Sequence, residues 1–133
     1  MKIHEYQAKD LFSRFEIPVP KGSVAENADQ AAKIAQDIGG DRWVIKAQVH
    51  AGGRGKGGGV RVAETPDQVS REAAGILGMN LVTHQTGPEG KLVRKLLIER
   101  GMYYPNDEGE VDVKEYYMSI LLNRKTGKNI IMY

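Results

Sequence analysis

Residues 44–62 read VIKAQVHAGGRGKGGGVRV, which is a short apolar run, a glycine-rich loop and an alternating run. The loop from Gly52 to Gly59 holds six glycines and two cations in eight residues, and Lys46 lies in the run before it. Glycines let backbone N–H groups approach an anion closely because no side chain intervenes. A lysine on a strand adds a fixed cation. The stretch therefore predicts a strand–loop–strand unit that covers phosphates.

Two common phosphate-binding motifs do not fit this loop. A P-loop requires a glycine five residues before its Gly-Lys pair and Ser or Thr after it, and Gly55-Lys56 has neither. The dinucleotide motif G-x-G-x-x-G matches at Gly53, Gly55 and Gly58, but a helix must follow it to hold the pyrophosphate. The residues that follow, VRVAETP, alternate like a strand. Both motifs are therefore rejected.

The kinase pattern G-x-G-x-x-G-x-V fits better in shape, because it describes a strand–turn–strand flap over nucleotide phosphates. In protein kinases the strand lysine comes after the flap, whereas Lys46 comes before it. The chain is therefore not a protein kinase. A lysine followed by a glycine flap is the order of the ATP-grasp enzymes.

Length and composition define the class of protein. The chain has 133 residues, 41% of them hydrophobic, with a net charge of +2 and no cysteine. These values predict one domain with a modest core and exclude a disulfide framework or a thiolate metal site. The charge alone does not argue for nucleic acid or a membrane, and no signal or membrane segment is visible. We expect a soluble intracellular protein.

Helices and strands are predicted to alternate in a mixed α/β chain. Helices are expected over residues 4–15, with an apolar stripe of Ala8, Leu11, Phe12 and Phe15, over 28–38 and over 66–77. Asn27 and Thr65 are the predicted caps of the second and third helices, with Gln30 and Gln68 three residues later. Strands are expected over 43–49, 60–62 and 96–98, with a hairpin formed by 116–122 and 130–133.

Two further segments affect the domain prediction. The stretch from Tyr103 to Lys114 is rich in acids and turn residues, which predicts an exposed loop without a metal site. The chain stops within KNIIMY, an apolar strand with no polar tail. We therefore expect residues 1–133 to be the first part of a longer protein.

Several motifs resemble one family across essentially the whole chain. They are HEYQAK near the start, K-x-QVHAGGRGK-x-GGV, LVTHQTGPEG, LIER and KEYYMSILLNR. In this order they are similar to the nucleotide-binding β subunits of succinyl-CoA synthetases, also called succinate–CoA ligases. The resemblance implies the N-terminal portion of an ATP-grasp fold, with a mixed sheet, a strand–glycine flap–strand unit and flanking helices.

The resemblance also implies which residues contact the nucleotide. Lys46 matches the phosphate-binding strand lysine, and the flap residues Gly53, Arg54 and Gly55 match the phosphate loop. On the hinge, Glu99 matches the acid beside the adenine, and Met102 is the nearest match for a residue whose backbone meets the base. Glu115 matches an acceptor for ribose hydroxyls, and Pro20 falls where the purine pocket begins. Structural alternatives stay open: a solubilising strand lysine for Lys46, a surface glutamate for Glu115, and a flexible RGG-like linker for the loop.

The histidines receive a different role. In this family the phosphoryl group passes through a phosphohistidine of the partner α subunit, so none of His4, His50 and His84 is expected to be catalytic. His50 lies beside the flap, and a hydrogen-bonded structural role is the favoured interpretation. The magnesium ligands of the family, an Asn and an Asp, are expected beyond Tyr133, so no metal ligand is assigned here.

The function implied by the resemblance is that of an acid–thiol ligase of the tricarboxylic acid cycle. Succinate, CoA and ATP or GTP would give succinyl-CoA, ADP or GDP and phosphate, with Mg²⁺ and an α subunit as partners. The residues 1–133 alone are expected to be inactive. The alternatives are a malate–CoA ligase, an ATP-citrate lyase segment, or a noncatalytic phosphate- or RNA-binding module. The expected location is the bacterial cytoplasm, or the mitochondrial matrix in a eukaryote.

Overall fold

The computed structural model describes residues 2–102 and 115–133. The chain divides into two compact units, Met1–Met102 and Tyr103–Tyr133, and each is described by itself. The acidic loop expected between Tyr103 and Lys114 lies outside the described residues. Within the described ranges, no helix has both the length and the apolar character needed to cross a bilayer.

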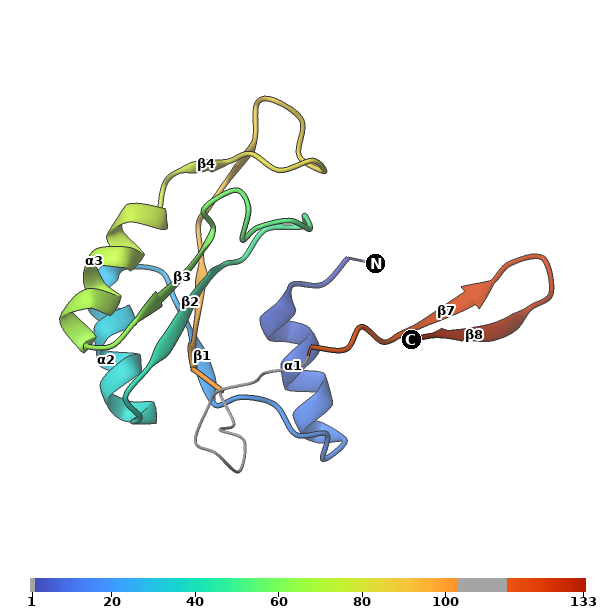
Figure 1. The fold of residues 1–133 in the computed structure, drawn as a ribbon, viewed down its shortest axis with the longest axis horizontal. Coiled ribbons are helices and arrows are strands. Elements are labelled where there is room, and N and C mark those ends of the chain that lie inside the picture. Colours follow the sequence, from blue (N-terminus) through green and yellow to red (C-terminus); the bar gives the residue numbers. More distant parts are fainter. Residues whose placement is uncertain (1, 103–114) are drawn as a thin grey trace. The chain divides into compact units, whose positions relative to one another are not determined.

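A four-stranded antiparallel sheet forms the centre of the first unit (Figure 1). Its order is β1-β6-β2-β3, with β1 Gly22–Ala25, β6 Leu96–Arg100, β2 Trp43–Ala47 and β3 Val60–Ala63. β2 pairs with β3 so that Lys46 faces Val60, which makes the glycine loop the connection of a hairpin. The predicted strand–loop–strand unit is confirmed. A strand rather than a helix follows the loop, which agrees with rejecting the dinucleotide motif.

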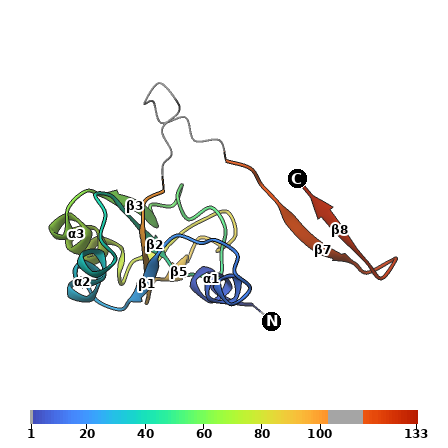
Figure 2. The same ribbon diagram turned by 90° about the horizontal axis from the view of Figure 1, so that it is seen from below.

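Helices α2, Ala28–Ile38, and α3, Pro66–Ile76, pack against each other and cover one face of this sheet (Figures 1 and 2). The predicted caps are confirmed: the backbone N–H of Gln30 donates to Asn27 Oδ1 at 2.9 Å, and that of Gln68 to Thr65 Oγ1 at 3.2 Å. Each cap satisfies a backbone donor that the first helical turn leaves without a partner. Local chemistry therefore sets where both helices begin.

The core lies between these two helices and the sheet. β2 alternates, with Trp43, Ile45 and Ala47 buried and the two residues between them only half-buried. On α2 and α3 the buried side chains recur at helical spacing, as expected for faces that pack on a sheet. They are Ala31, Ala35, Val69, Ala73 and Ile76.

Helix α1, Glu5–Arg14, lies on the other side of the sheet from α2 and α3 (Figure 2). It begins after His4, whose backbone N–H donates to Gln7 Oε1 at 2.8 Å. The apolar stripe predicted on this helix does not form part of the core, because α1 contains no buried residue and Phe15 is 76% exposed. Polar contacts, described below, fix α1 to the sheet instead.

The remaining strands form two small antiparallel pairs. β4, Asn80–Leu81, pairs with β5, Lys91–Leu92, in the first unit. In the second unit, β7, Ser119–Asn123, pairs with β8, Lys128–Met132. The predicted hairpin is confirmed, with Gly127 in its turn at φ 67°, although β7 begins three residues later than expected. β1, β4 and β5 were not predicted.

Candidate functional site

Lys46 lies on the face of the sheet that α1 covers. The core-facing residues of β2 are Trp43, Ile45 and Ala47, so the alternation of a strand turns Lys46 to the opposite face. The β2–β6 register places Lys46 beside Leu97 and Val44 beside Glu99. Glu99 therefore shares this face with Lys46, one strand away.

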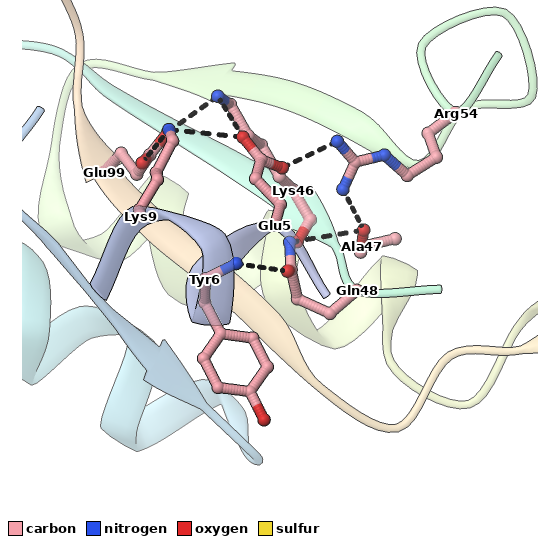
Figure 3. Close-up of polar contacts among 8 residues, drawn as sticks. All are labelled: Glu5, Tyr6, Lys9, Lys46, Ala47, Gln48, Arg54 and Glu99. Carbon is pink, nitrogen blue, oxygen red and sulfur yellow. Dashed lines mark hydrogen bonds and ion pairs between the residues drawn. The ribbon is translucent and has the colours of Figure 1, made fainter. Parts of the chain in front are cut away.

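Glu99 is a buried carboxylate with two lysine partners. Its side chain is 2% exposed, and it accepts from Lys46 Nζ at 2.6 Å and from Lys9 Nζ of α1 (Figure 3). A buried carboxylate requires such partners because its charge has left water. Gly22 of β1 lies opposite Glu99, and a Cβ there would come within 2.7 Å of Glu99 Cγ. Glycine at this position leaves the space that the carboxylate occupies.

Glu5, at the start of α1, connects the strand lysine to the glycine loop. Its Oε1 lies 3.1 Å from Lys46 Nζ and 3.2 Å from Lys9 Nζ, and its Oε2 accepts from Arg54 Nη2 at 2.6 Å (Figure 3). The other amino group of Arg54, Nη1, donates to the carbonyl of Ala47 at 2.7 Å. The arginine of the loop therefore bends back to the strand and does not project into solvent.

The pKa shifts follow from these contacts. Burial alone would raise the pKa of Glu5, but the hydrogen bond from Arg54 and the charges of Lys46 and Arg54 outweigh it and lower the pKa to about 2. Burial would lower the pKa of Lys46, yet its hydrogen bond and ion pair with Glu99, together with Glu5, raise it. Both groups are therefore charged at neutral pH.

The glycines of the loop differ in whether the fold requires glycine at their positions. Gly53 has φ 74°, and a Cβ on it would lie 2.8 Å from the ring of His84. A Cβ on Gly57 would lie 2.5 Å from the carbonyl oxygen of Val82. Gly55 has neither restriction, because its φ is not positive and a Cβ there would meet nothing within 4 Å. Packing explains the first two, whereas the fold gives no reason for glycine at position 55.

Gln48 fixes α1 to the end of β2. Its side chain is buried, accepts from the backbone N–H of Tyr6 at 3.2 Å and donates to the carbonyl of Lys46 at 3.1 Å. One amide thus joins the first turn of α1 to the strand that carries the lysine (Figure 3). These bonds take the place of the apolar packing that α1 lacks.

His4 and His50 stack beside the loop with ring centroids 3.8 Å apart. Burial, followed by the nearby charge of His50 and then of Lys95 and Arg54, lowers the pKa of His4. The structure places His50 in a ring stack, and the hydrogen-bonded structural role expected for it stays a prediction. Within residues 2–102 and 115–133, no group of three or more His, Asp or Glu side chains could hold a metal ion.

Two cavities adjoin the charged cluster of Glu5, Lys9, Lys46, Arg54 and Glu99. The first has a volume of about 700 Å³ and is lined by Lys9 and Glu99 together with the segment from Val19 to Val24. The second has a volume of about 660 Å³ and is lined by Glu5 and Arg54 together with the histidine pair and the loop backbone. Pro20, predicted near a purine pocket, lines the first cavity.

The structure brings together most of the residues predicted for the site. Lys46 and Glu99 are in direct contact, and Arg54 joins them through Glu5, with Gly53 and Gly55 on either side of Arg54. Met102 follows β6 and is 50% exposed.

Other parts of the site prediction are untested or incomplete. Glu115 is exposed and belongs to the second unit, so its role beside a ribose stays a prediction. Glu5, Lys9 and Gln48 were not predicted as site residues. The motifs HEYQAK and QVHAGGRGK, which contain them, were the available signal.

Comparison with known proteins gives the family. The family model for the ATP-grasp domain matches residues 2–133. The chain belongs to the ATP-grasp family. This membership agrees with the lysine-first order of β2 and the glycine hairpin, and it confirms the predicted ATP-grasp fold. The prediction of a mixed sheet was wrong, because the pairings of β1, β6, β2 and β3 are all antiparallel.

Three curated relatives of this ATP-grasp chain are each named as the β subunit of an ADP-forming succinate–CoA ligase. The protein of Polynucleobacter necessarius is 56% identical, and those of Sulfurovum sp. and Desulfatibacillum aliphaticivorans are each 53% identical, in each case over 133 residues. The alignments cover 99% of this chain and 32% of each relative. The chain thus spans about a third of the length of the curated relatives that it matches.

Proposed function

We propose that this chain is the nucleotide-binding portion of the β subunit of a succinate–CoA ligase. One observation carries the proposal. In an ATP-grasp fold, Lys46 of the strand and Arg54 of the glycine hairpin both contact the same carboxylate, that of Glu5. Two fixed cations and exposed backbone amides suit the phosphates of a nucleoside triphosphate. The names of the relatives supply the acid, the thiol and ADP as the product.

The proposed chemistry depends mostly on position and charge. Phosphoryl transfer requires that the charge of the phosphates be neutralised and that the transferred group be aligned. In this proposal Lys46, Arg54 and the amides of Gly53 and Gly55 hold the phosphates, and Glu99 keeps Lys46 in place. The base would lie in the cavity lined by Pro20 and Glu99, and Met102 would contact it. A contact of Glu115 with the ribose is proposed separately, from the family resemblance alone.

The partner and the metal belong to the same proposal. A β subunit implies an α subunit, which would carry the phosphorylated histidine. Together the two subunits would catalyse a step of the tricarboxylic acid cycle in the cytoplasm. The described residues do not fit a protein site for Mg²⁺, because Glu5 and Glu99 are committed to cations and no further cluster is present among them. Magnesium would enter with ATP or GTP, and its protein ligands are expected outside residues 1–133.

The activity can be tested with the protein at its natural length and its α subunit. We expect a thioester to form only when succinate, CoA and ATP or GTP are all present. Its formation is measured by ultraviolet absorbance. Thioester formed with malate but not with succinate would instead support a malate–CoA ligase. No thioester with any dicarboxylate would overturn the proposal.

The role of Lys46 is tested by the substitution Lys46→Ala in the same protein. A charge-assisted contact with phosphate contributes about 1.5–3 kcal/mol, so Mg-ATP binding should weaken by roughly 10- to 150-fold. Phosphorylation of the α-subunit histidine should fall with it. The matched control is Lys33→Ala, which removes an exposed lysine that pairs with Asp37 in α2. Calorimetric affinities of the two variants within twofold of each other would contradict the assignment.

A further inference from the structure

Glu5 occupies the position where the two cations of the proposed phosphate site converge. One of its oxygens contacts Lys46 Nζ at 3.1 Å and the other accepts from Arg54 Nη2 at 2.6 Å. The contacts join three elements that are separate in sequence: α1, β2 and the glycine loop. A carboxylate that bridges an ammonium and a guanidinium group makes the same kinds of contact that a phosphate makes with two of its oxygens.

Arg54 keeps a second anchor that does not depend on Glu5. Its Nη1 donates to the carbonyl of Ala47 at 2.7 Å, so the guanidinium group stays beside β2 when its other amino group changes partner. Lys46 likewise keeps Glu99 at 2.6 Å. Both cations can therefore exchange Glu5 for another anion without losing their position.

The charges of the cluster limit what can share it. Lys9, Lys46 and Arg54 carry three positive charges against the two negative charges of Glu5 and Glu99. A polyphosphate that approaches Lys46 and Arg54 meets the Glu5 carboxylate within contact distance of both donors, and like charges at this separation repel. Glu5 and a polyphosphate therefore compete for the same two side chains.

We propose that Glu5 is an internal competitor of polyphosphate: it latches the glycine loop to α1 through Arg54 and is displaced from Lys46 and Arg54 when the phosphates of a nucleotide bind. The latch would set the affinity of the site and couple phosphate binding to release of α1 from the loop. This inference rests on the proposed nucleotide-binding function, and it adds a role for a residue of α1.

The first test is binding of inorganic triphosphate and of Mg-ATP, by calorimetry, to the protein at its natural length. Glu5→Gln removes the negative charge but keeps the shape of the side chain, and we expect binding to tighten by about three- to tenfold. Asp37→Asn is the matched control, because Asp37 is an exposed acid of α2 that pairs with Lys33 and lines neither cavity. Its affinity should equal that of the wild type. Glu5→Gln binding that is unchanged or weaker would overturn the proposal.

The second test measures the contact between Glu5 and Arg54 in the absence of a nucleotide. Trypsin cleaves after Arg54 only when that side chain can enter the protease, so the initial cleavage rate there should rise several-fold in Glu5→Gln and stay unchanged in Asp37→Asn. If Glu5→Gln does not fold, Glu5→Asp takes its place, because the shorter side chain cannot reach both cations. An unchanged cleavage rate in the folded variant would overturn the latch.

The two proposals fail in different ways. If the wild-type protein binds neither triphosphate nor Mg-ATP, the nucleotide-binding function is wrong, and the competitor role falls with it. If the wild type binds Mg-ATP and Lys46→Ala weakens this binding as predicted, while Glu5→Gln does not tighten it, only the role of Glu5 is wrong.

Discussion

The side chain of Glu99 has both of its oxygens bound to lysine ammonium groups and almost no contact with solvent. Such a carboxylate is stable because Lys9 and Lys46 replace the water that it has lost. The arrangement also fixes the direction of Lys46, whose long side chain would otherwise sample many rotamers. A single buried acid thus keeps the strand lysine in one position.

The substitution Glu99→Gln tests this arrangement. The amide cannot neutralise Lys9 and Lys46, so we expect the free energy of unfolding to fall by about 2–4 kcal/mol. Urea denaturation of both proteins measures the difference. Asp37→Asn breaks an exposed pair with Lys33 and should change stability by less than about 0.5 kcal/mol. Equal losses in the two variants would show that the burial of Glu99 has no energetic effect.

Single residues also show where sequence reasoning succeeded at the site and where it stopped. Lys46 and Arg54 could be predicted because both lie in one continuous motif. Glu5 lies 41 residues from Lys46 and 49 from Arg54, and Lys9 lies 90 residues from Glu99. Periodicity carries no information on contacts of this range. The motif of α1 was recognised, but its physical role needed three dimensions.

At the scale of elements, some glycines of the loop are required by packing, whereas another leaves room for a ligand. Gly57 and Gly53 lie against Val82 and His84, so their lack of a side chain serves the fold. Gly55 faces open space without a positive φ. If the loop covers phosphates, position 55 is where a methyl group would obstruct the ligand and leave the protein unaffected.

Gly55→Ala and Gly57→Ala form the matched pair that tests this division. Gly55→Ala should change the free energy of unfolding by less than about 0.5 kcal/mol and weaken Mg-ATP binding several-fold. Gly57→Ala should lower the free energy of unfolding by about 1–3 kcal/mol, because the new Cβ would overlap the Val82 carbonyl. Thermal and urea denaturation, together with calorimetry, measure both. Unchanged nucleotide binding in Gly55→Ala would argue against phosphates at this part of the loop.

The elements themselves differ in how well the sequence predicted them. α2 and α3 begin where predicted because Asn27 and Thr65 supply cap oxygens within three residues of the donors that they satisfy. The strand β1, Gly22–Ala25, was missed because its four residues are too short to display a pattern. Its place is set by pairing with β6, far along the chain. The stripe on α1 indicated a helix correctly but not its burial.

At the scale of the whole molecule, the free energy of unfolding should depend on pH through the titration of Glu5. The folded state holds the pKa of Glu5 at about 2, below its ordinary value of 4.5, so the folded state binds fewer protons than the unfolded state in this range. The contribution of Glu5 is therefore complete above pH 4.5 and is lost as the pH falls through 2. Lys46, whose pKa is raised, stays charged throughout.

This dependence is measured as the difference in unfolding free energy between the wild type and Glu5→Gln at pH 5, 4, 3 and 2. The difference should shrink by roughly 2–3 kcal/mol between pH 5 and pH 2, because Glu5 gains its proton in the unfolded state before it does so in the folded state. Solvent screening reduces this value little, because the side chain of Glu5 is mostly shielded from solvent. Taking the difference removes the titration of the other carboxylates. Parallel curves for the two proteins would contradict the lowered pKa of Glu5.

The buried acid shared by Lys9 and Lys46 also has a consequence for how this protein can diverge over generations. Replacing Glu99 leaves Lys9 and Lys46 with the single carboxylate of Glu5, and replacing either lysine deprives the buried carboxylate of one of its two charged partners, so each first step toward a different set is harmful. Selection should remove such intermediates before a compensating change arises. We therefore expect the three positions to covary in descendants of this lineage, and to be inherited together even where the surrounding surface has drifted freely.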